Sequence, residues 1–204
     1  MSKPIPIGIT SDAVSGATLF ANRRDALAMW PKNSKVAELG VGFGGYTAEI
    51  LTTVKPSQFD AYDLFNLHEI PMLWGKPSSE IFNGKTQREY YENKFREAFS
   101  SGVLNAYPGD SSTQLSSRPP ATYDVIYIDG DHTIRGAARD TEAAVKAIKS
   151  NGILVFNDYV VYDKAGEMYG VVHAVNDLCV NHGWRVLYLA LQTEMFCDIA
   201  LVRG

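Results

Sequence analysis

The sequence predicts an α/β fold built on a doubly wound sheet of seven strands, most of them parallel. Two observations along the 204 residues predict it. Short apolar runs alternate with segments of helical periodicity, which favours parallel strands joined by helical crossovers. Two further apolar runs follow one another closely near the C-terminal end, which favours an antiparallel hairpin. No break in composition divides the chain, so we predict a single domain over residues 1–204.

The first half of the chain is predicted from apolar spacing and from helix start and stop signals. A helix is expected over residues 12–30, with Pro31 closing it. A short strand at 35–39 leads into a glycine loop and a helix, and a second strand follows at 58–64. Residues 65–85 are irregular, and Thr86 and Glu89 then have the spacing of a capping box. The helix that they start is predicted to stop at Gly102. We interpret residues 65–100 as an insertion and a candidate substrate lid.

The second half of the chain continues the alternation. Strands are predicted at 103–107, 123–129 and 152–158, and helices at 137–149 and 171–182. The run at 123–129 is almost continuously apolar, which is typical of a strand buried on both faces. The last two strands, at 184–191 and 194–202, are separated by two or three residues and are expected to pair antiparallel.

Composition narrows the classes of partner. The net charge is −4 and no cluster of Lys and Arg stands out, which argues against a nucleic-acid partner. No apolar run is long enough to span a membrane, and the first residues do not resemble a secretory signal. We therefore expect a cytoplasmic protein that does not bind membranes. Cys179 and Cys197 are isolated and are expected to be buried and reduced. A homo-oligomer remains open.

The loop in VAELGVGFGG, residues 36–45, carries the first functional signal. The residues Gly40, Gly42 and Gly45 satisfy the dinucleotide pattern G-x-G-x-x-G. Glycines permit a tight turn and a close ligand, and the helix that follows offers free N–H groups to an anion. The pyrophosphate of NAD and the carboxylate of a methionyl group both fit such a loop. An NAD-dependent oxidoreductase and a non-catalytic nucleotide-binding protein therefore remain alternatives.

Two acidic residues beside the loop distinguish these ligands. Glu38 lies inside the first strand, where a carboxylate is costly to bury unless a cation or a hydrogen-bond donor meets it. A dinucleotide site has no need of such a group. Asp63 ends the second strand, where a carboxylate can accept both ribose hydroxyl protons. A capping role in a turn is the alternative for Asp63.

The run Glu38-Leu39-Gly40-Val41-Gly42-Phe43-Gly44 resembles the acidic-x-Gly-x-Gly-x-Gly motif of the class I S-adenosylmethionine (SAM)-dependent methyltransferases. The resemblance extends from about residue 20 to the end of the chain, apart from residues 65–100, and implies their Rossmann-like fold, with SAM as cofactor. It also implies the following cofactor-binding residues: Glu38, Gly40, Gly42 and Gly44 at the methionyl end, Asp63 at the ribose, Gly109, Asp110 and Ser111 at the adenine, and, without a stated partner group, Leu64 and Asp129.

Polar side chains follow the fourth and fifth strands. Asp129 ends the fourth predicted strand, with Asp131 and His132 just beyond it, and Asn157 and Asp158 end the fifth. Because neighbouring parallel strands end at one edge of the sheet, we expect these side chains to converge. Two carboxylates and an amide oxygen suit Mg²⁺. Capping, turn-forming and surface roles are the structural alternatives, and a methyltransferase that needs no metal is the alternative among enzymes.

The same residues resemble the site of the metal-dependent O-methyltransferases of the macrolide-sugar and catechol types. That resemblance implies Asp129, Asn157 and Asp158 as metal ligands and His132 as the base. The catechol type has the amide and the acid in the opposite order, so which of the two coordinates stays open. The sequence thus predicts methyl transfer from SAM to a hydroxyl of a small molecule such as a sugar, polyol or phenol, at a Mg²⁺-assisted site.

Overall fold

The computed structural model describes residues 5–204 of the chain. Its main sheet contains eight strands, which are β1 (Thr18–Phe20), β2 (Lys35–Leu39), β3 (Gln58–Asp63), β6 (Leu104–Pro108), β7 (Tyr123–Ile128), β8 (Ile148–Phe156), β9 (Trp184–Ala190) and β10 (Asp198–Arg203). Their order in space is β1-β9-β10-β8-β7-β2-β3-β6. β10 pairs antiparallel with both of its neighbours, and the other pairs of this sheet are parallel. The predicted mostly parallel α/β sheet is confirmed.

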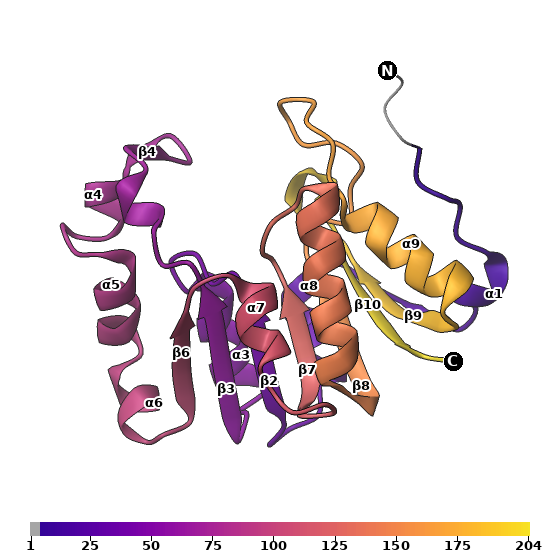
Figure 1. Cartoon of the computed structure of the whole chain (residues 1–204), viewed down its shortest axis with the longest axis horizontal. Coiled ribbons are helices and arrows are strands. Elements are labelled where there is room, and N and C mark those ends of the chain that lie inside the picture. The colour runs from indigo at the N-terminus through magenta and orange to yellow at the C-terminus, as the bar shows by residue number, and fades with distance from the viewer. Residues whose placement is uncertain (1–4) are drawn as a thin grey trace.

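Helices cover both faces of the sheet (Figure 1). The helices are α1 (Ser11–Val14), α2 (Arg23–Ala26), α3 (Gly45–Thr53), α4 (Ser78–Ile81), α5 (Gln87–Lys94), α6 (Arg96–Ser100), α7 (Ser111–Ser116), α8 (Ile134–Ala147) and α9 (Val171–Asn181), with 3₁₀ turns η1 (Leu27–Met29), η2 (Leu67–Glu69) and η3 (Thr193–Met195). One apolar core joins the sheet to α1, α7, α8 and α9. The other core joins the opposite face to α2, η1, α3 and α5. This two-sided covering is the doubly wound arrangement.

The prediction of seven strands was wrong by one, because the predicted helix over 12–30 does not form. The segment contains α1, β1, α2 and η1 instead, and β1 pairs with the edge of β9. Gly16 has a φ of +79°, which ends α1. The side chain of Asn22 accepts a hydrogen bond from the backbone N–H of Asp25 and starts α2. These two breaks leave three residues extended between them.

The predicted terminal hairpin is present, with a longer connection than expected. β9 and β10 pair antiparallel from Asp198 opposite Ala190 to Arg203 opposite Trp184. Residues 191–197 connect them and include η3. Because β10 runs against its neighbours, its beginning lies beside the end of β8, where Ile199 pairs with Phe156. The connection therefore lies at the edge of the sheet where the parallel strands end.

The insertion is less irregular than its sequence indicates. Residues 65–85 contain η2, α4 and a separate antiparallel pair, β4 (Met72–Leu73) with β5 (Lys76–Pro77). The capping box at Thr86 and Glu89 is confirmed, with each residue bonding to the other's backbone. The helix that it starts is interrupted at Phe95, so α5 and α6 replace one predicted helix. The Trp74 side chain lies against Phe43 of the glycine loop, with ring centroids 5.6 Å apart.

The structure bears on two expectations from composition, which concern membrane-spanning helices and the state of the cysteines. Over residues 5–204, no helix combines the length and apolar character needed to cross a membrane. Both cysteines are buried and neither forms a disulfide.

Candidate active site

The glycine loop connects β2 to α3, and three of its glycines meet different surroundings. Gly40 has a φ of +80°, and a Cβ there would lie 2.0 Å from the backbone oxygen of Asp129. Gly44 has a φ of +72° and precedes the first residue of α3, where a Cβ would meet the ring of Phe95 at 2.5 Å. At Gly42 the φ is +53°, but a Cβ there would have nothing within 4 Å. The space beside Gly42 is therefore open to a ligand.

Glu38 is buried beneath this loop, with 2% of its surface exposed. Its carboxylate accepts a hydrogen bond of 2.5 Å from the Thr47 hydroxyl, which in turn accepts one from Tyr91. Burial raises the pKa of Glu38 to about 8, and the charge of Asp63 acts in the same direction. A cationic ligand at this position would favour the ionised form.

Asp63 holds the glycine loop through its side chain. One carboxylate oxygen accepts from the backbone N–H groups of Val41 at 2.7 Å and Gly42 at 3.3 Å. The other accepts from the N–H of Phe65 at 2.6 Å and the side-chain amide of Gln87 at 3.2 Å. The residue thus ties β3 to the loop and to α5. Leu64, which follows it, is 60% exposed.

The segment predicted to border the adenine forms the start of α7. Asp110 caps this helix by accepting a hydrogen bond from the Thr113 N–H at 2.9 Å. The same carboxylate oxygen accepts a hydrogen bond from the Arg139 guanidinium at 2.9 Å. Hydrogen bonds from Thr113 and Ser112 lower the pKa of Asp110 to about 2. Ser111 donates to Asp140 at 2.6 Å, and Gly109 has a φ of +124°. These contacts give the segment a defined shape at the end of β6.

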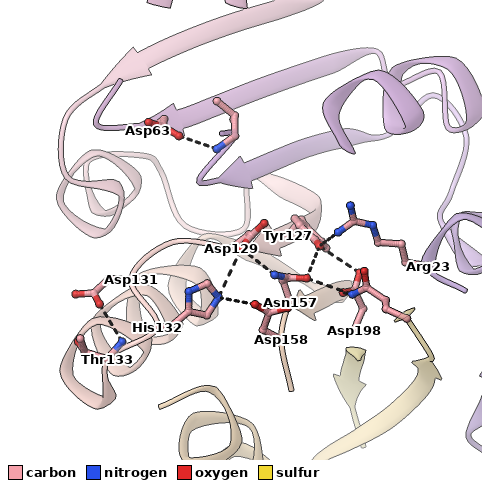
Figure 2. A network of polar contacts seen from close by, with 12 residues as sticks. Arg23, Asp63, Tyr127, Asp129, Asp131, His132, Thr133, Asn157, Asp158 and Asp198 are labelled. Atoms are coloured by element: carbon pink, nitrogen blue, oxygen red, sulfur yellow. Dashed lines mark hydrogen bonds and ion pairs between the residues drawn. The ribbon is translucent and has the colours of Figure 1, made fainter. Parts of the chain in front are cut away.

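Asp129, His132 and Asp158 converge at the ends of β7 and β8 (Figure 2). The His132 Nε2 atom lies 3.6 Å from an oxygen of Asp129 and 3.7 Å from an oxygen of Asp158. Both distances exceed a normal hydrogen bond, and no described residue bonds to this buried atom. The ring stacks on Tyr169, with centroids 4.6 Å apart. Asp158 has a φ of +55°, a conformation that is uncommon outside glycine.

Burial sets the protonation of this cluster. Removal from water lowers the pKa of His132, with Asp158 and Asp131 acting in the opposite direction. It raises the pKa of Asp129, to which the charge of Asp158 adds, and it raises the pKa of Asp158. The lowered pKa of His132 favours the neutral imidazole, which can accept a proton.

Asn157 does not present its oxygen as the predicted metal set requires. Its Nδ2 donates to Asp129 at 2.9 Å, while its Oδ1 accepts from the Tyr127 hydroxyl at 3.2 Å. The carboxylates of Asp129 and Asp158 fit a hard cation, and the amide as placed does not. Among residues 5–204, no group of three or more His, Cys, Asp or Glu side chains has the arrangement of a metal site. The donor set fits Mg²⁺ only in part.

Sequence reasoning missed a second layer of polar residues behind this cluster. Asp198, at the start of β10, is fully buried, and burial raises its pKa to about 7. It accepts from Gln192 at 2.6 Å and from Tyr127 at 3.2 Å. Arg23 of α2 donates to the Tyr127 hydroxyl at 3.3 Å. One signal was available, because Asp198 is an acid inside an apolar strand, as Glu38 is.

Comparison with known families identifies the class. A model for a family described as a methyltransferase domain matches residues 37–159, which is more than half of the 204-residue chain. The chain therefore belongs to this methyltransferase-domain family, and the assignment supports SAM as its cofactor. It does not favour the NAD-dependent oxidoreductase. A search of curated proteins finds no match.

Solved structures share the fold at low sequence identity. An O-methyltransferase family protein from Burkholderia thailandensis has a TM-score of 0.59 and 13% identity, over 89% of this chain and 55% of that one. A spermidine synthase from Thermotoga maritima has a TM-score of 0.57 and 16% identity, over 90% and 57%. A SAM dependent methyltransferase from Aquifex aeolicus has a TM-score of 0.55 and 12% identity, over 89% of each chain. This chain thus spans less than two thirds of the length of the first two.

Proposed function

We propose that this protein transfers the methyl group of SAM to a hydroxyl oxygen of a small molecule, such as a sugar, polyol or phenol, with His132 as the base. One observation carries the proposal. The His132 Nε2 atom is buried at the carboxyl edge of the sheet with no hydrogen-bond partner among the described residues, and it faces two carboxylates. A neutral imidazole in that position can remove a proton and keep it.

The cofactor is proposed to lie against the glycine loop. The open space at Gly42 would admit its methionyl end, and the buried carboxylate of Glu38 would face the positive charge. Asp63 shapes the loop, and with Leu64 it would border the ribose. The segment Gly109, Asp110 and Ser111 would border the adenine, and the backbone of Asp129 lies against Gly40 on the other side of the loop.

The proposed transfer needs one base and one line of attack. The acceptor hydroxyl gives its proton to the His132 Nε2 atom as its oxygen forms a bond to the sulfonium methyl carbon. The bond between that carbon and sulfur breaks, and sulfur keeps the electron pair, so that S-adenosylhomocysteine leaves as a neutral thioether. Asp129 and Asp158, at 3.6 and 3.7 Å, would stabilise the imidazolium that forms.

Mg²⁺ assistance is part of the proposal, with Asp129 and Asp158 as the residues that would hold the ion. A bound Mg²⁺ would lower the pKa of an acceptor hydroxyl. Asn157 could join them only if its amide turned by 180°. The chain's own residues then orient the hydroxyl, take its proton and exclude bulk water from the buried Nε2 atom.

The test begins with binding and then measures turnover. Calorimetry should show heat with SAM and S-adenosylhomocysteine but not with NAD. A panel of sugars, polyols and phenols is then screened for S-adenosylhomocysteine release. His132→Ala should lower kcat by about 10²- to 10⁴-fold while leaving SAM affinity unchanged. The matched control is His182→Ala, since that side chain is 58% exposed and pairs with Asp177 on the surface.

Two outcomes would count against the proposed chemistry. Undiminished turnover in His132→Ala would show that His132 is not the base. Undiminished turnover in the presence of EDTA would show that the reaction needs no metal ion. Binding of NAD without binding of SAM would contradict the cofactor assignment.

A further inference from the structure

Both ends of the Asn157 amide are occupied by protein groups. The residue follows β8 and is 7% exposed. Its Nδ2 donates to an oxygen of Asp129 at 2.9 Å. Its Oδ1 receives the Tyr127 hydroxyl at 3.2 Å and the Gln192 side-chain amide at 3.4 Å. The same Asp129 oxygen lies 3.6 Å from His132. Asn157 therefore contacts the carboxylate that faces the proposed base.

The surrounding groups determine which way this amide points. If it turned by 180°, two oxygens would face each other across the 2.9 Å that now separates Asn157 from Asp129. Its nitrogen would then face the Gln192 amide, which is itself a donor. On the Asp129 side the turned amide would place two acceptor oxygens against each other. On the other side its nitrogen would oppose the Gln192 donor and could donate only to the Tyr127 hydroxyl oxygen, which already accepts from Arg23. The observed orientation satisfies both ends.

A buried carboxyl group holds the donors behind Asn157 in place. Asp198 is fully buried and accepts from the Gln192 amide at 2.6 Å, which fixes the nitrogen that also faces Asn157. Tyr127 lies between Asp198 and Asn157, and Arg23 donates to its hydroxyl oxygen (Figure 2). These hydrogen bonds connect the ends of α2, β7, β8 and β10 into one network.

We propose that Asn157 is a positioning residue, held from behind by Gln192, Tyr127 and Asp198, which fixes the Asp129 carboxylate beside His132 and does not ligate a metal. The proposal rests on the proposed function for its catalytic consequence. It also gives a role to residues outside the family match at 37–159, since Arg23, Gln192 and Asp198 all lie beyond it. Substitutions of such supporting residues commonly cost about 10- to 100-fold in activity.

Three variants test the proposal against metal ligation. Asn157→Asp keeps the shape and offers a ligand but loses the donor to Asp129. Asn157→Ala removes both the possible ligand and the donor to Asp129. Gln192→Leu keeps Asn157 and removes the hydrogen bond that supports it from behind. Asn181→Asp is the matched control, because Asn181 donates to Asp177 at 2.7 Å in an exposed copy of the same pair. We expect the first three to lower kcat about 10- to 100-fold at saturating Mg²⁺, with the KM for SAM unchanged. The control should keep the wild-type rate.

The dependence on Mg²⁺ separates the two roles. Loss of a ligand raises the Mg²⁺ concentration needed for half-maximal activity, and excess Mg²⁺ restores the rate. Loss of a positioning residue lowers the rate even at saturation. Restoration of Asn157→Ala by excess Mg²⁺, or a wild-type rate in Asn157→Asp, would overturn the proposal.

A crystal structure with S-adenosylhomocysteine and Mn²⁺ gives a readout that needs no turnover. The proposal requires the Asn157 nitrogen on Asp129 in the wild-type protein, and a displaced Asp129 in Gln192→Leu. An Asn157 oxygen at coordination distance from Mn²⁺, or an unmoved Asp129 in the variant, would overturn it. Absence of methyl transfer by the wild-type protein would contradict the proposed function, and the crystal structures would still decide the role of Asn157.

Discussion

At the scale of single residues, Glu38 is expected to couple cofactor binding to the release of a proton. Its pKa is raised to about 8, so in the free protein it is largely protonated at pH 7. A cationic cofactor favours the ionised carboxylate. We expect SAM affinity to increase as the pH rises from 6 to 8, with proton release on binding. Calorimetry in two buffers of different ionisation enthalpy measures both quantities.

The control for this prediction is Glu38→Gln. The amide keeps an oxygen for the Thr47 hydroxyl, which lies 2.5 Å from the carboxylate. The variant should bind SAM more weakly, release no proton and show no rise in affinity over the same pH range. An unchanged pH dependence in Glu38→Gln would assign the effect to another group.

Gly40 and Gly42 are expected to be glycines for different reasons, Gly40 because the protein packs against it and Gly42 because a ligand would. Both have positive φ angles, so alanine is strained at either position by about 1 kcal/mol. At Gly40 a Cβ would also lie 2.0 Å from the Asp129 backbone oxygen, whereas at Gly42 it would meet nothing within 4 Å. We expect Gly40→Ala to lower the unfolding free energy by several times more than Gly42→Ala.

Urea denaturation measures that difference, and SAM binding is measured on the same samples. Gly42→Ala should lose only about 1 kcal/mol of stability from the positive φ, and it should lose SAM affinity because its methyl group would occupy the open space. Equal destabilisation by the two substitutions would show that the loop relaxes around Gly40.

At the scale of elements, the Asp63 side chain connects β3 to the glycine loop and to α5 through hydrogen bonds. Its carboxylate accepts four hydrogen bonds, three from backbone N–H groups and one from Gln87. We expect Asp63→Ala to lower the thermal midpoint without SAM present, since buried donors lose their partner. A role confined to the ribose predicts a loss of SAM affinity with no change in the midpoint. The control is Asp177→Asn, whose carboxylate is 53% exposed.

The elements that could be predicted are those with a local signal. Apolar runs, the glycine loop and the capping box at Thr86 each depend on residues a few positions apart, and the strands and helix start that they predict are present. β1 has no such signal, because it is a short edge strand with two exposed residues that pairs only with β9. It forms where Gly16 and Asn22 interrupt the helical pattern.

The candidate site follows the same division. The convergence of Asp129, His132 and Asp158 was predictable, because parallel strands end at one edge of the sheet and each residue directly follows or lies near a strand end. The orientation of Asn157 was not, because it depends on Gln192 and Tyr127, which are distant in sequence. The hydrogen bond from Arg23 to Tyr127 was not predictable either, because Arg23 lay inside the helix wrongly predicted for residues 12–30.

At the scale of the whole molecule, buried acids from several strands make stability depend on pH. The pKa values of Glu38 and Asp198 are raised to about 8 and about 7. Below these values the folded protein holds protons that the unfolded chain, with lower carboxyl pKa values, has already released. Their contribution to stability is therefore present at low pH and is lost as the pH rises through the folded values. His132 has the opposite sign, and its lowered pKa costs stability mainly below about pH 6.5.

We therefore expect the unfolding free energy of the SAM-free protein to fall by roughly 2 kcal/mol between pH 6.5 and 8.5, where His132 offsets only a small part of the effect. Urea denaturation at a series of pH values in one ionic strength measures it. Glu38→Gln combined with Asp198→Asn should make the fall smaller, because neither amide titrates. Asp129 and Asp158, whose pKa values are also raised by burial, keep part of the pH dependence. Saturating SAM should also weaken the fall, since the cationic cofactor stabilises the ionised form of Glu38. A wild-type profile that is flat, or that rises over this range, would mean that the two carboxyl groups are already ionised in the folded protein.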